Sequence, residues 1–166
     1  DTIWTTAKNA GMPLNSPLNE GGPSISADGR VLFFTACDRP DGLGSCDIYL
    51  SQRLGDGNWS KPLNIGAPVN SQSWESQPSF SSDGRTLYFV RGSYTRDRSR
   101  IFDIYSSTFQ VDMTWSNPVK LSDTINTSGV EESVFIHPDN QTLYFSSDGH
   151  PGMGGLDIFV SRRLEN

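Results

Sequence analysis

The hydrophobic residues of this chain fall in short runs that return at nearly regular intervals. Three such runs, 31–36 (VLFFTA), 86–91 (TLYFVR) and 142–147 (TLYFSS), are rich in the β-branched and aromatic residues that favour β-strands. The runs do not alternate apolar and polar residues, as strands of a sheet with one solvated face would. We therefore expect these strands to be covered on both faces.

Each run has the same neighbours along the chain. A short strand and an Asp-Gly or Asp-Asn pair precede it, and we expect a two-residue hairpin turn there because both pairs tolerate positive φ. A third strand is predicted at 47–50 (DIYL), 103–106 (DIYS) and 157–160 (DIFV). A fourth strand is predicted to begin near a tryptophan. The pattern thus indicates a repeated unit of four strands.

The register of this repeat holds without a gap over 31 residues, and its tryptophans lie 55 and 56 residues apart. Because the same residue type recurs in each unit, we interpret the recurring residues as structural. Tryptophans would pack between units, glutamates would hydrogen-bond a neighbouring strand, and aspartates would form turns or lead into the third strand. The recurring residues are Trp4, Trp59 and Trp115; Asn15, Asn70 and Asn126; Glu20, Glu75 and Glu131; Asp28, Asp83 and Asp139; Asp47, Asp103 and Asp157.

Four antiparallel strands per unit, packed face to face on their neighbours, are typical of a β-propeller blade. We predict an all-β chain in which residues 1–166 form a single β-propeller region, with repeat units at about 4–58, 59–114 and 115–166. A β-sandwich with an accidental repeat is the alternative. Propeller rings typically have 4–8 blades, so about three blades leave apolar faces open. We expect further blades of the same protein, or a second copy, to close the ring.

Charge and composition exclude some partners. The net charge of −6 argues against nucleic acid, whose phosphates require clustered positive charge. No apolar run approaches the roughly 18 residues of a membrane span, so we expect no direct membrane insertion. The chain starts at Asp1 with neither Met nor an apolar leader, and we therefore expect a processed protein or an excised fragment.

Three stretches of the repeat resemble a known family: 27–51 (ADGRVLFFTACDRPDGLGSCDIYLS), 59–71 (WSKPLNIGAPVNS) and 75–90 (ESQPSFSSDGRTLYFV). They look like the TolB-like propeller repeats of periplasmic OmpA-family proteins of Bacteroidetes, of the PorE-like kind that belongs to the type IX secretion system. The resemblance covers essentially the whole chain. It implies a periplasmic, outer-membrane-associated scaffold that binds proteins in the cell envelope. Peptidoglycan-binding residues of that family would lie outside this chain.

We predict that the chain is not an enzyme and needs no cofactor. Paired carboxylates serve glycosidase chemistry, so a glycan-binding or glycan-hydrolysing propeller is the alternative function. Catalytic carboxylates need unlike environments, however, whereas the three repeated glutamates share one position of the repeat. The two cysteines, His137 and His150 form no recognisable zinc pattern, and no metal site is expected. Calcium on the Asp-rich turns stays open, although no EF-hand spacing exists.

Candidate binding residues are those that break the repeat. Trp74 occurs in only one unit, which favours an exposed contact. The loop between the second and third strands of the middle unit gathers arginines around a tyrosine, a combination that suits an acidic partner. A solvated loop is the alternative. The loop candidates are Arg91, Tyr94, Arg96, Arg98 and Arg100.

Cys37 ends one predicted strand and Cys46 begins its hairpin partner. Neighbouring antiparallel strands come close enough for a disulfide, so we predict that these two cysteines are bonded. Such a bond implies an oxidising compartment, which agrees with the periplasm.

Overall fold

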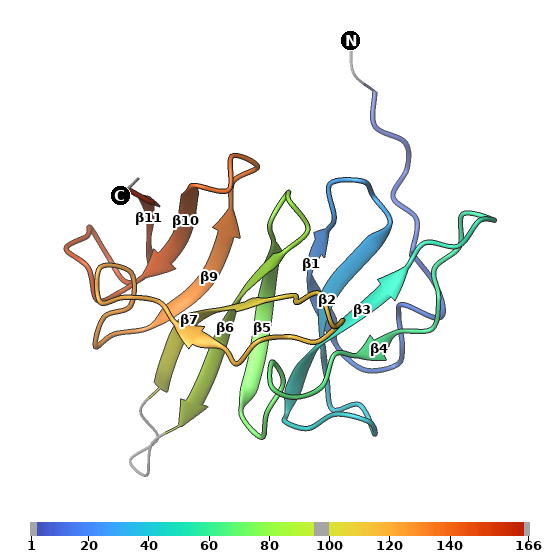
Figure 1. Ribbon diagram of the computed structural model, residues 1–166, viewed down its shortest axis with the longest axis horizontal. Helices are drawn as coiled ribbons and strands as arrows, with labels where there is room; N and C mark the ends of the chain where they lie inside the picture. Colours follow the sequence, from blue (N-terminus) through green and yellow to red (C-terminus); the bar gives the residue numbers. More distant parts are fainter. Residues whose placement is uncertain (1–2, 95–99, 165–166) are drawn as a thin grey trace.

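A computed structural model of the chain describes residues 3–94 and 100–164, and the regular elements of this part are all β-strands (Figure 1). No helix among these residues is long and apolar enough to cross a membrane. The strands are β1 (Glu20–Ile25), β2 (Val31–Cys37), β3 (Cys46–Gln52), β4 (Leu63–Asn64), β5 (Trp74–Phe80), β6 (Thr86–Tyr94), β7 (Arg100–Thr108), β8 (Val119–Lys120), β9 (Glu131–Ile136), β10 (Thr142–Ser147) and β11 (Asp157–Arg162).

The strands form three strand groups that follow the three repeats and stand side by side in an arc (Figure 1). The first strand group holds β1 to β4, the second β5 to β8 and the third β9 to β11, and neighbours within each group pair antiparallel. Single parallel bridges link the groups: Cys46 pairs with Trp74, and Phe102 pairs with Val130. The arc does not close, because the N-terminal segment and β11 lie at its opposite ends (Figure 1).

The apolar core lies between the strand groups. Four consecutive residues of β2, 33–36, are buried, as expected for a strand covered on both faces. Phe33 and Ile48 of the first group pack against Phe89 of the second. A second cluster joins the second and third groups in the same way, with Val90 and Phe145 among its members. Side chains on alternate faces of one strand therefore serve two different interfaces.

The expected two-residue hairpin turn is wrong. The Ser26 N–H donates to the Val31 carbonyl, and this closes a four-residue loop, 27–30. Only Gly29 of the Asp-Gly pair has positive φ, at 71°. The Asp28 carboxylate instead accepts hydrogen bonds from the Ser26 hydroxyl and the Arg30 N–H. The aspartate thus caps the loop with its side chain, which needs no unusual backbone conformation.

The fourth strand is shorter than predicted, and the third group has none beside β11 within residues 3–94 and 100–164. β4 and β8 contain two residues each. Pro62 and Pro118 precede them directly, and proline has no N–H to donate to a strand ladder. Residues 3–19, predicted to contain a strand of the same type, form none.

Candidate functional site

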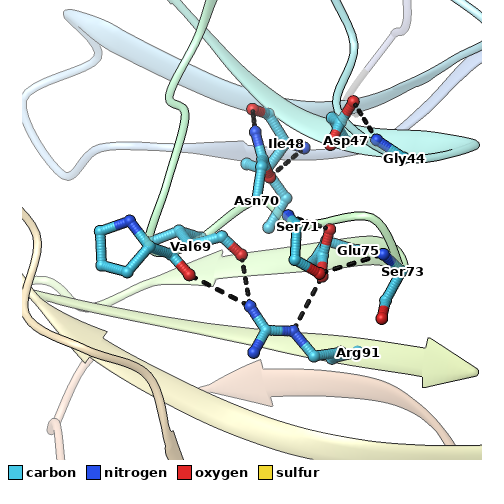
Figure 2. A network of polar contacts seen from close by, with 10 residues as sticks. Gly44, Asp47, Ile48, Val69, Asn70, Ser71, Ser73, Glu75 and Arg91 are labelled. Atoms are coloured by element: carbon cyan, nitrogen blue, oxygen red, sulfur yellow. Dashed lines mark hydrogen bonds and ion pairs between the residues drawn. The ribbon is translucent and has the colours of Figure 1, made fainter.

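Buried polar clusters stand at the first residue or two of β1, β5 and β9. In the second cluster the buried Glu75 carboxylate accepts hydrogen bonds from the Ser71 N–H (3.0 Å) and hydroxyl (2.5 Å). Arg91 Nε donates to the same carboxylate over 2.8 Å (Figure 2). The Arg91 guanidinium also donates to the carbonyl oxygens of Pro68 and Val69. This carboxylate is engaged from three sides inside the protein.

In the first cluster the Glu20 carboxylate is also bound by a serine and an arginine, but the arginine comes from a different position. Ser16 donates its N–H and hydroxyl to Glu20, and Arg39 Nη2 lies 3.0 Å from the carboxylate. Arg39 comes from the loop after β2, because Ala36 stands at the position that Arg91 has in β6. Burial acts to raise the pKa of Glu20, but the hydrogen bonds from Ser16 and Arg39 together outweigh it and lower that pKa.

The third cluster uses a hydroxyl in place of the guanidinium. Buried Glu131 accepts hydrogen bonds from the Thr127 N–H (3.2 Å), the Thr127 hydroxyl (2.8 Å) and the Ser147 hydroxyl (2.7 Å). Each of the three glutamates is therefore satisfied by residues of its own unit. An enclosed carboxylate with its oxygens occupied is poorly placed to exchange a proton with a substrate.

The recurring asparagines, whose role was not predicted, grip the third strand of the preceding group. The Asn70 side chain accepts a hydrogen bond from the Ile48 N–H (2.9 Å) and donates one to the Ile48 carbonyl (2.8 Å) (Figure 2). Asn126 does the same to Ile104, at 2.7 and 3.0 Å. We call this arrangement the asparagine clamp. The regular spacing of these residues was the signal that could have revealed it.

Asn15 has the conformation of a clamp but grips no strand among the described residues. Its N–H donates to the Gly11 carbonyl (3.0 Å) and its Nδ2 to Asn9 Oδ1 (2.8 Å). The equivalent contacts around Asn70 measure 2.8 and 2.7 Å. Beside Asn15 a hollow of about 1130 Å³ opens, and Arg39, which donates to the Leu14 carbonyl, lines it.

The repeated tryptophans do not share one environment. Trp115 lies between the first and second groups, with its ring 6.1 Å from that of Phe33 and 6.4 Å from that of Phe80. Trp59 packs on the cluster at the outer side of the first group. Trp4, however, is 90% exposed, so the predicted packing between units does not occur there. No strand group of the described chain lies beyond the first group to receive it.

Trp74 is not the exposed contact that its single occurrence suggested. Its ring is half-buried and stacks on Phe102, with the ring centres 4.9 Å apart and the planes 20° from parallel. A Cβ atom on Gly92 would lie 2.3 Å from the Phe102 ring, so the stack occupies the space that glycine leaves. Trp74 of β5 therefore packs against Gly92 of β6 and Phe102 of β7.

The arginine-rich loop is described only in part. Arg91 was predicted to bind a partner, but its guanidinium is hydrogen-bonded to Glu75 and to two backbone carbonyl groups. Tyr94 and Arg100 pair through their backbones at the ends of β6 and β7, and only their backbones are described. Arg96 and Arg98 lie outside the described residues.

The loop between β2 and β3 is closed by two different bonds. Cys37 and Cys46 form a disulfide, and the Asp47 carboxylate accepts the Leu43 N–H over 2.7 Å. In the third group Asp157 likewise accepts the Met153 N–H, over 2.6 Å. Asp103 pairs with Lys120 Nζ at 2.8 Å. Within residues 3–94 and 100–164, no three His, Cys, Asp or Glu side chains gather as a metal site would require.

No protein-family model and no curated protein matches the chain. Among solved structures, TolB from Acinetobacter baumannii is similar to 90% of this chain, with a TM-score of 0.58 and 17% identity, and the match covers 31% of TolB. The tricorn protease matches 78% of this chain and 15% of its own (TM-score 0.44, 11% identity). A Trypanosoma rangeli sialidase in complex with the inhibitor DANA matches 87% of this chain and 29% of its own (TM-score 0.47, 16% identity). The fold of this chain is thus all-β and similar to that of TolB, a β-propeller.

Proposed function

We propose that the chain is a non-catalytic, protein-binding β-propeller module of the bacterial cell envelope. It would work as a scaffold that presents rigidly held loops to a partner, as part of a periplasmic, outer-membrane-associated protein of the PorE-like kind. The similarity to TolB supports the fold on which this proposal rests. The resemblance of the repeat sequences supports the envelope location.

The observation that carries the proposal is the state of the repeated carboxylates. Glu75 and Glu131 are buried, and their oxygens accept hydrogen bonds from within their own units. These were the strongest candidates for acid–base chemistry in the sequence. With them engaged, the residues free to act are those on loops, and loops held by a rigid scaffold are common binding sites.

The loop between β6 and β7 is the proposed contact with an acidic protein. Its arginines break the repeat, and the guanidinium group matches carboxylates with two parallel hydrogen bonds. Arg91 is excluded from this role because it is bound to Glu75. The proposal therefore assigns binding to the remaining loop candidates, Tyr94, Arg96, Arg98 and Arg100.

A charge-reversal experiment tests this function. The chain and its Arg96→Glu/Arg98→Glu variant would each be immobilised and exposed to envelope proteins of the source bacterium. We expect at least one acidic protein to bind the original chain and to be lost with the variant. A matched variant, Arg53→Glu/Lys61→Glu, reverses two charges outside the loop and should retain that protein. Identical binding by all three chains would contradict the assignment.

A glycan-acting propeller would be revealed by turnover. The chain would be incubated with a panel of polysaccharides, and released reducing ends would be measured. We expect none above the background of a heat-unfolded sample. Hydrolysis that disappears in Glu75→Gln while the variant remains folded would overturn the non-catalytic proposal.

A further inference from the structure

We propose that the two ends of the arc bind each other between two copies of this chain. The N-terminal segment 3–15 of one copy would lie along β11 of the other as its fourth strand, and two equal junctions would close a ring of six strand groups. This goes beyond the proposed function, because it assigns a partner and a set of contacts to both ends of the chain.

Among the described residues, the outer edge of β11 is not paired with another strand. In the first two groups this edge is covered: Tyr49 pairs with Asn64, and Tyr105 pairs with Lys120. Within residues 3–94 and 100–164, no strand pairs with β11 at the equivalent Phe159 on the edge away from β10. Ile158 of β11 is 82% exposed, whereas its equivalents Ile48 and Ile104 are both 0% exposed, and Val160 is 61% exposed. Exposed apolar strand edges of this kind favour pairing with another chain.

The asparagine clamp gives this edge a specific partner. Asn70 grips Ile48 and Asn126 grips Ile104, each through both backbone groups. Ile158 is the equivalent residue of β11, and Asn15 is the equivalent clamp, already held by Asn9 in the gripping conformation. The sequence that is gripped is Asp-Ile followed by an aromatic residue in all three units.

A hollow between the second and third groups matches the exposed tryptophan at the other end. Trp115 sits against Phe33 and Phe80 and pairs with Phe109. The equivalent positions one unit later are Tyr88, Ile136 and Arg163. These three residues line a hollow of about 500 Å³ that holds no tryptophan among the described residues.

Trp4 is the residue that the repeat places in this hollow. It stands at the position of Trp59 and Trp115, and it is 90% exposed. Its docking would bury an indole ring beside Tyr88, and aromatic residues in such pockets contribute most to the affinity of interfaces.

Hydroxyl groups next to Trp59 and Trp115 bind the third strand, and the residues at the two ends of the arc carry the same groups. The Ser51 hydroxyl donates to the Ser60 carbonyl (2.6 Å), and Ser107 donates to the Ser116 carbonyl (2.7 Å). The Ser60 and Ser116 hydroxyls in turn accept the N–H of the next residue of the third strand, at 2.9 and 3.0 Å. The equivalent residues at the junction are Ser161 on β11 and Thr5 beside Trp4, and both carry the hydroxyl that this exchange needs.

One position departs from the internal junctions. Ser24 and Ser79 accept N–H groups of the following strand group, from Phe80 and Ile136. Phe135 replaces this serine in the third group and would face Ile25 of the second copy. Both side chains are exposed and apolar, so the junction exchanges a hydrogen bond for an apolar contact.

The two ends of one copy cannot meet, so the proposal assigns the contact to a second copy. The N-terminal segment lies beside β3 and β4 at one end of the arc, and β11 lies at the other end (Figure 1). Head-to-tail contacts between identical chains close into rings when the rotation allows it. Two copies give six strand groups, which falls inside the usual range of 4–8 blades.

The test is the mass of the 166-residue chain in solution, measured by sedimentation across micromolar concentrations. We expect a species of twice the 18.3 kDa of one chain. Trp4→Ala and Asn15→Ala should each weaken association by at least about tenfold, since each removes a contact worth roughly 1.4 kcal/mol or more. Val111→Ala, which truncates another exposed apolar side chain away from both ends, should leave the association unchanged.

Ile158→Pro tests the strand edge itself. Ile158 has the register on β10 that Ile48 has on β2, and the Ile48 N–H is clamped by Asn70, so proline at 158 removes the N–H that the clamp would take, together with the exposed isoleucine side chain. Circular dichroism would establish that each variant remains folded, and Asn15→Ala keeps the test decisive if the proline variant does not fold. A single-chain mass at all concentrations, or assemblies longer than two copies, would overturn the proposal and leave these ends to a further repeat unit or to another protein.

Discussion

At the scale of single residues, the molecule relies on polar side chains that satisfy backbone groups away from water. Asn70 supplies both a donor and an acceptor to Ile48: its Oδ1 accepts the Ile48 N–H, and its Nδ2 donates to the Ile48 carbonyl, which also accepts the Ile65 N–H. The repeated glutamates do comparable work for the N–H groups of Ser71 and Thr127. Buried polar groups of this kind cost little when paired and much when one partner is removed.

Replacing Asn70 by alanine should therefore destabilise the fold strongly. Asn70→Ala leaves the N–H of buried Ile48 without its partner, while the Ile48 carbonyl keeps the Ile65 N–H, and we expect a loss of roughly 1–3 kcal/mol in the free energy of unfolding. Urea denaturation would measure it. Asn58→Ala, at an exposed turn, is the matched control and should cost less than about 1 kcal/mol. Equal losses in the two variants would show that the clamp contributes nothing.

The Glu20 cluster should make stability depend on acid. A carboxyl whose pKa is lower in the folded state stabilises the fold above its ordinary pKa, near 4.5, and this contribution disappears as the pH falls through the folded-state value. Glu20→Gln should therefore be less stable than the original chain at pH 7, by about 1–3 kcal/mol. The gap should narrow below pH 4.5. A gap that stays constant between pH 7 and pH 3 would refute the ion pair's role.

The residues that recur in the sequence were easier to interpret than those that occur once. A residue type that recurs at one position of the repeat indicates a structural role, and the three glutamates do stand at equivalent places in their strand groups. Trp74 and Arg91 were taken as surface residues because they break the repeat, yet they fill spaces that open only after folding. Trp74 stacks on Phe102, and Arg91 lies over Glu75, contacts that join residues far apart in sequence.

At the scale of elements, hydrophobic patterning predicted the second and third strands well. Consecutive apolar residues require cover on both faces, and β2 is buried at four successive positions. The fourth strand was overestimated because Pro62 and Pro118 interrupt it: isolated bridges at Trp59 and Trp115 precede the prolines, and β4 and β8, of two residues each, follow them. The hairpin turn was misjudged because Asp28 acts through its side chain, which backbone preferences do not reveal.

The loop between β2 and β3 touches the connection that follows β4, and one glycine permits this contact. A Cβ atom on Gly44 would lie 1.8 Å from the Ser73 carbonyl oxygen. Gly44→Ala should therefore push the two segments apart and cost about 1–3 kcal/mol in thermal or chemical unfolding. Gly55→Ala has open space around it and serves as the control, with no loss expected. Similar melting of both variants would contradict the close approach.

At the scale of the whole molecule, the repeat predicted an all-β propeller, and the similarity to TolB supports that fold. The division into units at about residues 4, 59 and 115 stays a prediction, as do the envelope location and the partner. The sequence also indicated that three units leave apolar faces open. It did not show which residues stand ready to cover them, because the clamp and the tryptophan hollow are recognised only from contacts within the first and second groups.

The amide of Ile158 offers the most direct measurement. If a second copy fills the end of the arc, Asn15 grips this N–H, and its hydrogen exchange should be slowed as strongly as that of Ile48 and Ile104. Dilution, or Asn15→Ala, should abolish the protection at Ile158 and leave that of Ile48 and Ile104 unchanged. Exchange at Ile158 as rapid as that of a free strand edge, at concentrations where Ile48 and Ile104 are protected, would contradict the closed two-copy ring.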